Sequence, residues 1–353
     1  MWSFMKRYGN LYHKVYDVRN IYKAHKEASK GKHHYHEVKM VNDDLEYYME
    51  AIHDMLVNKT YQVSDYEIEY INDNGKEREV HKLPYYPDRI IQWAVLLQTS
   101  DIFLRSMTDF TCSSIKGRGG SKATKLLDKY IKKHDAVYCL KFDIKKYYPS
   151  INHNILKSMI RRKFKDKNLL WLMDTIIDSF PEKKGVPIGS YTSQYLANFY
   201  LSKFDHWLKQ SHRIKYVVRY MDDIVIVHKS KKYLHKLFRK IKSYLNEFLE
   251  LEIKKNWQIF PIHARGIDFV GYRHFSTHKL LRKSIAKRYK KRMMEINNAI
   301  CTDNLKEPAW RSAQSYKGWT NGCDSFGLRT KYLNPNIYGL DEFYFNNIKR
   351  KGR

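Results

Sequence analysis

The spacing of apolar residues changes several times along the chain, and each change marks an expected element. From residue 41 to 57 the apolar side chains recur every three or four positions, which is the repeat of one helical face. The residues on this face are Leu45, Tyr48, Ile52 and Leu56. We therefore predict a helical section over residues 1 to about 60.

Between residues 61 and 83 the apolar and polar residues alternate in short stretches instead. The sequence Asn-Asp-Asn-Gly at 72–75 interrupts this alternation with residues that favour turns. The segment is therefore expected to form a β-hairpin with a four-residue connection. Helical spacing resumes at residue 88.

Two apolar runs of strand character lead into acidic residues. The run from 136 to 142 ends at Asp143, and the run from 216 to 227 is interrupted by Met221-Asp222-Asp223. Both acidic clusters are therefore predicted at strand ends or on a hairpin. An amphipathic helix is expected over 230–250, where Lys alternates with aliphatic and aromatic residues. No internal repeat or linker divides the chain, which favours interleaved lobes of one enzyme.

The charge of the chain indicates a polyanionic partner. Lys and Arg number 66 against 37 Asp and Glu, and 29 tyrosines supply rings that can stack on bases. Basic membrane-surface proteins and ribosome-associated proteins share the same balance of charge. No apolar run approaches the ~18 residues of a membrane span, so a cytoplasmic enzyme without membrane association is expected.

The acidic residues Asp143, Asp222 and Asp223 need a reason in so basic a chain, because burying an unpaired carboxylate is costly. Metal coordination supplies one. Nucleotidyl transfer uses two divalent ions ~4 Å apart, and carboxylates suit Mg²⁺, with Mn²⁺ as a substitute. An Asp-Asp pair is also common in solvated turns. The apolar residues on both sides favour the metal-binding interpretation.

The tetrapeptide Tyr220-Met221-Asp222-Asp223, together with FDIKKYYPSI at 142–151, resembles the palm motifs of reverse transcriptases. The resemblance implies an RNA-directed DNA polymerase that acts by a two-metal mechanism. It also implies an α+β fold of the right-hand polymerase type, in which helices cover an antiparallel palm sheet. The implied division is an N-terminal helical section and fingers over 1–140, a palm over 141–275 with a fingers segment at about 155–185, and a helical thumb with a basic end over 276–353.

The same resemblance implies contacts with the incoming nucleotide. The cations that would meet the triphosphate are Arg78, Lys82 and Arg118, and ordinary surface cations are the alternative for each. Tyr148 falls where the family places a ring beneath the sugar, which would exclude a 2′-hydroxyl and select deoxynucleotides. Tyr147 is the alternative for this steric gate. Ile144 would lend its backbone carbonyl to a metal.

The fourth motif, GVPIGSYTSQ at 185–194, carries Ile188, Gly189 and Gln194 at nucleotide-binding positions. Most retroviral and group II intron enzymes have Gln-Gly where this chain has Ile-Gly. The arrangement Ile-Gly-x-x-x-Ser-Gln resembles reverse transcriptases of diversity-generating retroelements. These enzymes copy a template repeat RNA into cDNA with errors at adenines. An apolar substitution in another bacterial reverse transcriptase is the alternative.

Residues 251–255 resemble the sixth motif of the family, and residues 266–272 resemble the seventh, the primer grip. A strand there would seat the primer end, and a plain core strand is the alternative. The basic stretch 283–292 would form a thumb helix on the phosphates of the template–primer duplex. The residues implied in these contacts are Phe269, Gly271, Tyr272, Lys287 and Arg288.

The resemblance implies several partners in a bacterial, phage or archaeal host. They are template RNA, cDNA or its primer, deoxynucleoside triphosphates and a small basic helical accessory variability protein. Two alternatives stay open: a group II intron-like or phage-defence reverse transcriptase, and an RNA-binding protein on a decayed palm. The three intact aspartates argue against the second alternative.

Overall fold

A computed structural model describes residues 6–73, 75–302 and 307–332 of the chain. The chain forms two compact units, each assembled from separate segments. The first unit comprises Met1–Gly119, Phe142–Ile224 and His235–Trp257, and the second comprises Gly120–Lys141, Val225–Leu234 and Gln258–Arg353. The chain therefore passes between the units several times, as expected for interleaved lobes. The assignment of fingers, palm and thumb to particular residues stays a prediction.

Helices make up most of the first unit. They are α1 (Tyr12–Tyr16), α2 (Val18–Ala28), α3 (His36–Asp43), α4 (Leu45–Val57), α5 (Ile90–Arg105), α7 (His153–Arg161), α8 (Lys167–Asp178), α9 (Tyr191–Tyr200), α10 (Ser202–Gln210) and most of α11 (Lys231–Leu249), with short helical turns at Tyr85–Arg89 and Tyr148–Ser150. The expected N-terminal helical section is confirmed, because Met49, Ile52 and Leu56 of α4 are fully buried on one face.

One carboxylate fixes the start of two helices in this unit. Asp166 accepts hydrogen bonds from the N–H groups of Asn168 and Leu169, at 3.2 Å each, and so caps α8. Its other oxygen accepts from the N–H groups of Leu11 and Tyr12 at the start of α1. The start of α1 is thereby anchored to a segment that follows it by more than 150 residues.

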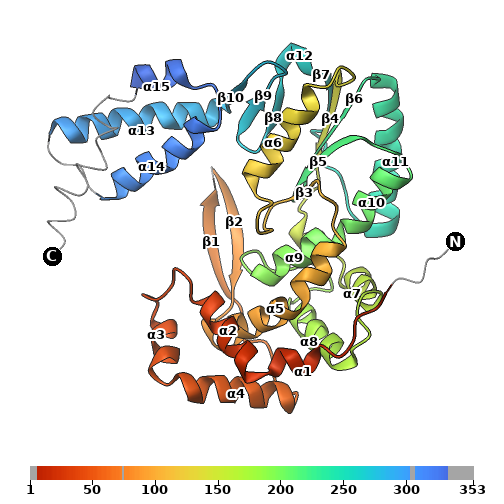
Figure 1. Cartoon of the computed structure of the whole chain (residues 1–353), viewed down its shortest axis with the longest axis vertical. Coiled ribbons are helices and arrows are strands. Elements are labelled where there is room, and N and C mark those ends of the chain that lie inside the picture. The colour runs from red at the N-terminus through yellow and green to blue at the C-terminus, as the bar shows by residue number, and fades with distance from the viewer. Residues whose placement is uncertain (1–5, 74, 303–306, 333–353) are drawn as a thin grey trace. The chain divides into compact units, whose positions relative to one another are not determined.

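The predicted hairpin is present, and its strands are β1 (Glu67–Asp73) and β2 (Lys76–Lys82). The predicted four-residue connection is wrong, because Asp73 pairs with Lys76 and only residues 74–75 separate the strands. Gly75 has a φ of 81°, which a glycine adopts without steric cost in so tight a turn. Figure 1 shows the hairpin extending away from α2 and α5 of the same unit.

A five-stranded sheet of order β3-β5-β6-β4-β7 carries both acidic segments. Its strands are β3 (Thr111–Cys112), β4 (Tyr138–Asp143), β5 (Tyr216–Tyr220), β6 (Asp223–His228) and β7 (Gln258–Pro261). The strand predictions are confirmed, since β4 ends at Asp143 and a turn at residues 221–222 separates β5 from β6. The sheet is not wholly antiparallel as expected, because β3 and β5 run parallel. Its central strands are buried on both faces, which accounts for their continuous apolar runs.

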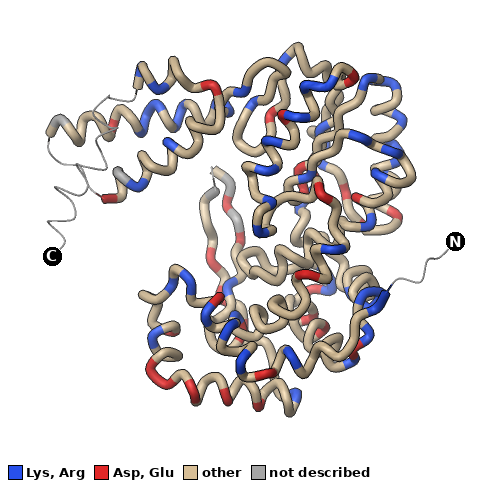
Figure 2. The backbone as a smooth tube through the Cα atoms, viewed as in Figure 1, with Lys and Arg blue, Asp and Glu red and all other residues tan. Residues whose placement is uncertain are grey.

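Acidic residues are concentrated in one part of the first unit. Figure 2 shows Asp and Glu gathered on α3 and α4. The residues are Glu37, Asp43, Asp44, Glu46, Glu50 and Asp54. Because this surface would repel phosphates, contact with a polyanion is expected elsewhere on the chain.

The second unit contains a three-stranded sheet of order β10-β9-β8 and several helices. Its elements are α6 (Gly120–Ile131), α12 (Ile262–Arg265), β8 (Ile267–Phe269), β9 (Tyr272–His274), β10 (Lys279–Leu281), α13 (Lys283–Cys301), α14 (Glu307–Asn321) and α15 (Phe326–Tyr332). The expected basic helix at 283–292 is confirmed as the first part of α13. The expected single strand through 269–272 is wrong, because the positive φ of Val270 (44°) and Gly271 (80°) turns the chain into a hairpin.

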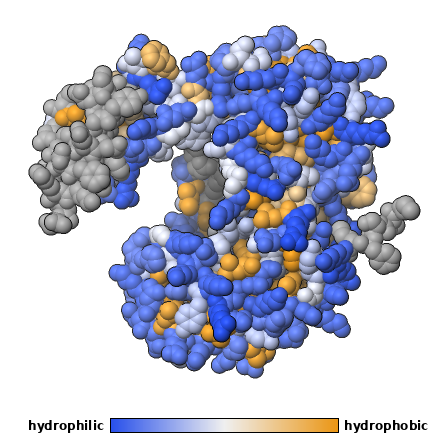
Figure 3. Space-filling model, viewed as in Figure 1, coloured by the Kyte–Doolittle hydropathy of each residue, from blue (hydrophilic) through white to orange (hydrophobic). Residues whose placement is uncertain are grey.

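The face of the molecule seen in Figure 3 is mostly hydrophilic. This agrees with a chain that carries 66 Lys and Arg residues. Among the helices that the structure describes, none has the length and apolar character needed to cross a membrane.

Candidate functional site

The acidic turn, residues 221–223, joins β5 to β6 in a strained conformation. Met221 has a φ of 56°, in a left-handed region that costs a non-glycine residue about 1–3 kcal/mol. Its N–H donates to the carbonyl of Cys112 on β3 at 3.3 Å. Strain of this kind persists only where the surroundings restrain it, and it is common at functional sites. Asp222 follows the strained residue directly, and Asp223 begins β6.

The end of β4 meets the acidic turn. The N–H of Ile144 donates to the carbonyl of Asp222 at 3.4 Å, which places Asp143 beside the turn. Lys254 also contacts Asp143: its N–H donates to the Asp143 carbonyl at 2.9 Å, and its Nζ is 3.8 Å from Oδ1. The Asp143 side chain is 26% exposed, so a ligand can reach it. The backbone segments that carry the three predicted aspartates therefore adjoin.

The donor chemistry of these strand ends fits Mg²⁺, which prefers carboxylate and carbonyl oxygens. Asp143, Asp222, Asp223 and the carbonyl of Ile144 supply oxygens of both kinds. Within the described ranges 6–73, 75–302 and 307–332, however, no three His, Cys, Asp or Glu side chains are grouped so as to hold an ion. Metal binding by the three aspartates and Ile144 therefore stays a prediction.

Two adjacent tyrosines after β4 have different surroundings. Tyr147 is buried, and its hydroxyl donates to the carbonyl of Ala197 at 2.5 Å. Tyr148 is partly exposed, and its hydroxyl donates to Sδ of Met221 at 3.7 Å. Burial, and then the negative charge of Asp222, raises the pKa of Tyr148 above its ordinary value. Of the two rings, Tyr148 is therefore the one directed at the acidic turn.

A pocket rich in cations lies at the start of α9 and encloses about 210 Å³. Lys82 and Gly189, two of the residues predicted to meet the nucleotide, both line it. Lys32 and Arg89 are further cations in its walls, and none of its lining residues is acidic. The rings of Trp93 and Tyr191, which also line the pocket, stack on each other with centroids 4.5 Å apart. A pocket of this composition suits a phosphate group attached to a base.

The fourth motif forms the turn into α9 and the first part of that helix. Ser190 caps α9 by accepting from the N–H of Ser193, and its hydroxyl donates to Oε1 of Gln92 at 2.6 Å. Gly189 has a φ of 110°, and an added Cβ would lie 3.3 Å from the Val80 side chain, so this position requires glycine. Of the other motif residues, Ile188 is partly buried in the turn, and Gln194 is partly buried on α9.

The two remaining triphosphate candidates lie elsewhere. Arg118 does not line the pocket; its Nη1 donates to the carbonyl of Thr108 at 3.0 Å, and its Nη2 is 3.9 Å from Asp109. These contacts give Arg118 a structural role in its own loop. Arg78 lies on β2, but its side chain falls outside the described part of the structure.

The predicted primer-grip residues belong to the second unit. Phe269 and Tyr272 are buried there, and an added Cβ at Gly271 would collide with the ring of Trp319. The alternative of a core segment thus fits the two rings, and their contact with a primer stays a prediction. Lys287 and Arg288 are exposed on α13 beside the buried Tyr289, as expected for a basic helical face.

Sequence reasoning missed the charged residues that surround the acidic turn. Arg219 lies inside β5 between two apolar residues and is fully buried. A charged residue within a buried strand indicates that a charged partner lies nearby, because a buried charge is costly unless it is paired. Its partner Asp205 lies on α10, and Lys254 approaches Asp143 from the segment after α11. Arg219 is close to Asp222 in the sequence, but no local spacing links Asp205 or Lys254 to the aspartates.

Known proteins similar to this chain include the following. Residues 71–274 match the family model "Reverse transcriptase (RNA-dependent DNA polymerase)". The mitochondrial nuclear intron maturase 4 of Arabidopsis thaliana is 28% identical over 140 residues, which cover 37% of this chain and 17% of the maturase. The apo telomerase structure from Candida tropicalis has a TM-score of 0.46 at 15% identity, and covers 61% of this chain and 48% of its own. The Candida albicans telomerase, solved with a fragment of telomeric RNA, has a TM-score of 0.47 at 12% identity, with 68% and 52% covered.

The chain thus spans about half the length of the solved telomerases that it matches, and a smaller part of the maturase. The expected α+β class is confirmed by the helices and sheets of the structure, and the expected right-hand polymerase type agrees with the family match. Members of this family generally use divalent metal ions. Because the matched residues 71–274 are more than half of the 353, the chain belongs to the reverse transcriptase (RNA-dependent DNA polymerase) family.

Proposed function

We propose that this protein is an RNA-directed DNA polymerase whose active site is formed by the acidic turn and the end of β4. The observation that carries the proposal is the hydrogen bond from the Ile144 N–H to the Asp222 carbonyl. This bond joins the strand end that bears Asp143 to the turn that bears Asp222 and Asp223. Membership of the reverse transcriptase family supports the same activity.

In this proposal the carboxylates of Asp143, Asp222 and Asp223, with the Ile144 carbonyl, hold the divalent ions. Two bound ions would lower the pKa of the primer 3′-hydroxyl and neutralise the pyrophosphate leaving group. The ammonium of Lys254 adds positive potential beside Asp143, where the anionic triphosphate is expected to bind.

The pocket at the start of α9 supports a neighbouring nucleotide site. Lys82 and Gly189 line it together, so two separate motifs of the sequence converge there. Its cations attract phosphates, and the absence of a side chain at Gly189 lets a ligand approach the backbone closely. Tyr148 extends this proposed site at the acidic turn, where it would lie under the sugar.

Template-directed synthesis is the direct test of the proposed function. The purified protein is expected to extend a primer on an RNA template with deoxynucleotides and Mg²⁺ or Mn²⁺. The products should follow the template sequence and disappear when EDTA removes the metal. Product formed without a template would instead favour the phage-defence alternative. RNA binding without any extension would favour a noncatalytic protein.

We further propose that the enzyme copies a template repeat RNA with errors at adenines, as in diversity-generating retroelements. Support comes from Ile188, which precedes Gly189 where a glutamine is usual in other family members. The partners in this proposal are the template RNA, the cDNA and its primer, deoxynucleoside triphosphates and a small basic helical accessory protein. The similarity to an intron maturase keeps the group II intron-like alternative open.

Ile188→Gln is expected to lower misincorporation opposite template adenine several-fold, with polymerase activity retained. A glutamine can donate a hydrogen bond that positions the incoming nucleotide, whereas isoleucine offers only packing. One such bond is worth on the order of 1 kcal/mol, which is several-fold in error rate. The measurement is sequencing of cDNA made on one defined RNA template by both proteins.

Ile188→Leu is the control for this experiment, because it keeps an aliphatic side chain of the same volume. It should preserve the error spectrum of the parent. An unmodified enzyme whose errors are already rare and even across the four bases would contradict the diversity-generating role. The broader polymerase proposal would then remain.

A further inference from the structure

Arg219 is a fully buried arginine in the strand that leads into the acidic turn. Its side chain and that of Asp205 on α10 are both 0% exposed. Nε of Arg219 lies 2.9 Å from Oδ1 of Asp205, and Nη2 lies 2.6 Å from Oδ2, so the pair is bidentate. Burial by itself lowers the pKa of Arg219, but the charge and hydrogen bonds of Asp205 raise it above its ordinary value. The arginine therefore stays charged inside the unit.

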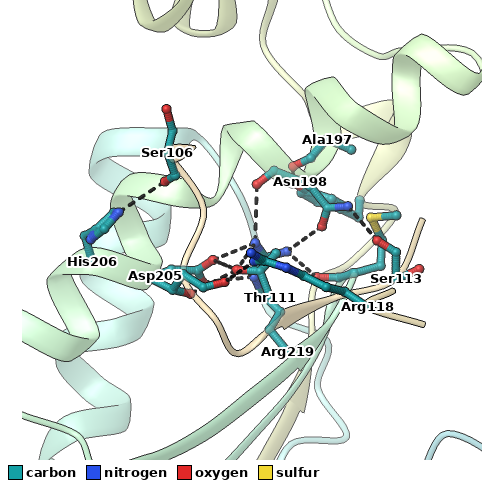
Figure 4. Close-up of polar contacts among 12 residues, drawn as sticks. Ser106, Thr111, Ser113, Arg118, Ala197, Asn198, Asp205, His206 and Arg219 are labelled. Atoms are coloured by element: carbon teal, nitrogen blue, oxygen red, sulfur yellow. Dashed lines mark hydrogen bonds and ion pairs between the residues drawn. The ribbon is translucent and has the colours of Figure 1, made fainter. Parts of the chain in front are cut away.

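The remaining donors of Arg219 bind groups around the turn, and Figure 4 shows the cluster that results. Nη1 donates to the carbonyl of Met221 at 2.9 Å and to Oδ1 of Asn198 at 3.2 Å. Nη2 donates to the carbonyl of Asn198 at 3.3 Å. Asp205 Oδ2 accepts from the hydroxyl of Thr111 at 2.9 Å. One guanidinium thus connects β3, α9 and α10 to the acidic turn.

Met221 is restrained through both of its main-chain polar groups. Its N–H donates to the Cys112 carbonyl on β3, and its carbonyl accepts from Arg219. The φ of 56° at this residue is one that a non-glycine side chain adopts only under such restraint. Arg219 therefore helps to hold the residue that immediately precedes Asp222.

Stability alone does not account for this ion pair. Replacing a buried ion pair with well-packed apolar residues is often neutral or stabilising. The neighbours Val217, Val218 and Ile224 are fully buried, so this layer of the unit accommodates aliphatic side chains. An apolar pair would, however, leave the carbonyl of Met221 without its donor from Arg219. The ion pair therefore serves to hold the Met221 carbonyl in place at the turn.

We propose that Arg219 and Asp205 are a positioning pair that holds the Met221 carbonyl and so sets the place of the Asp222 carboxylate relative to Asp143. The pair is buried and acts through the main chain rather than on the substrate. The inference rests on the proposed function, because it takes the acidic turn to be the metal site.

The double substitution Arg219→Met with Asp205→Leu tests the pair without leaving one buried charge unpaired. The variant is expected to stay folded and to keep the RNA affinity of the parent, with a lower thermal unfolding midpoint because the Met221 carbonyl loses its donor. Its kcat in primer extension should fall about 100-fold, and Mn²⁺ binding followed by electron paramagnetic resonance should weaken about 10-fold. The KM for deoxynucleotide should change much less, because neither residue contacts the nucleotide.

The control removes a more exposed Arg–Asp pair that bridges two helices. Arg161 on α7 and Asp174 on α8 form a two-point ion pair in the same unit, with Nη1 3.2 Å from Oδ1. Arg161→Met with Asp174→Leu should leave kcat and Mn²⁺ affinity unchanged. Equal losses in both double variants would overturn the inference, because the effect would then be general.

If the apolar double variant does not fold, Arg219→Lys tests whether Arg219 positions the acidic turn. Lysine keeps a charge beside Asp205, but one ammonium cannot replace the planar fork that reaches both Asp205 and the Met221 carbonyl. Reduced kcat and Mn²⁺ affinity in a folded Arg219→Lys protein would support the positioning role. A kcat and an Mn²⁺ affinity equal to those of the parent would overturn the positioning role, whether found in Arg219→Lys or in the folded double variant. A parent protein that extends no primer would contradict the proposed function instead, and the Mn²⁺ titration would still test this pair.

Discussion

Asp222→Asn is expected to reduce template-directed primer extension by at least about 1,000-fold while leaving the protein folded and able to bind RNA. The substitution exchanges a carboxylate for a neutral amide of the same shape, so the turn keeps its backbone contacts and loses a metal ligand. Loss of metal-assisted charge stabilisation is worth several kcal/mol, and about 4 kcal/mol corresponds to this factor. Single-turnover extension of a labelled primer on an RNA template measures the change.

Two controls separate a lost ligand from lost structure. Asp54 is an exposed aspartate on α4, and Asp54→Asn should extend primers at the parental rate. Thermal unfolding and RNA binding of the Asp222→Asn protein should match those of the parent. Parental extension by a well-folded Asp222→Asn protein would show that the acidic turn does not hold the catalytic metal.

Tyr148→Ala is expected to raise the use of ribonucleotides relative to deoxynucleotides by about 10- to 200-fold, the range that a pocket wall gives by steric exclusion. Removing the ring opens space beside Asp222, where the 2′-hydroxyl of a ribonucleotide would otherwise collide. The effect should lie mainly in kcat/KM for the ribonucleotide. Competition between the two nucleotides on one RNA template provides the measurement.

The neighbouring tyrosines supply matched controls for this experiment. Tyr148→Phe loses only the hydroxyl that contacts Met221, so it should keep the sugar selectivity of the parent. Tyr147→Phe loses the hydrogen bond to Ala197 in the core, which should lower stability without changing selectivity. Unchanged selectivity in Tyr148→Ala would exclude Tyr148 as the gate.

The local features of the candidate site could be predicted from the sequence because they depend on residues close together in the chain. The strand before Asp143 follows from a short apolar run, the strands around Asp222 follow from β-branched runs, and the amphipathic α11 follows from its helical period. Local rules were less reliable at the turns. The hairpin of β1 and β2 has a shorter connection than its turn-forming residues suggested, and the segment at 269–272 folds back on itself, because the partner strand decides where pairing stops.

The sequence by itself determined the family, the acidic residues and the strands that carry them, since motif and period are encoded within short windows. Only the tertiary structure decided how those residues are held. The approach of Lys254 to Asp143 and the shared pocket of Lys82 and Gly189 join segments far apart in the chain. The pairing of Arg219 with Asp205 joins a strand to the helix that precedes it. A charge inside a buried strand shows that a partner must exist. Which carboxylate takes that place depends on the packing of helices against the sheet, and no spacing in the sequence encodes that choice.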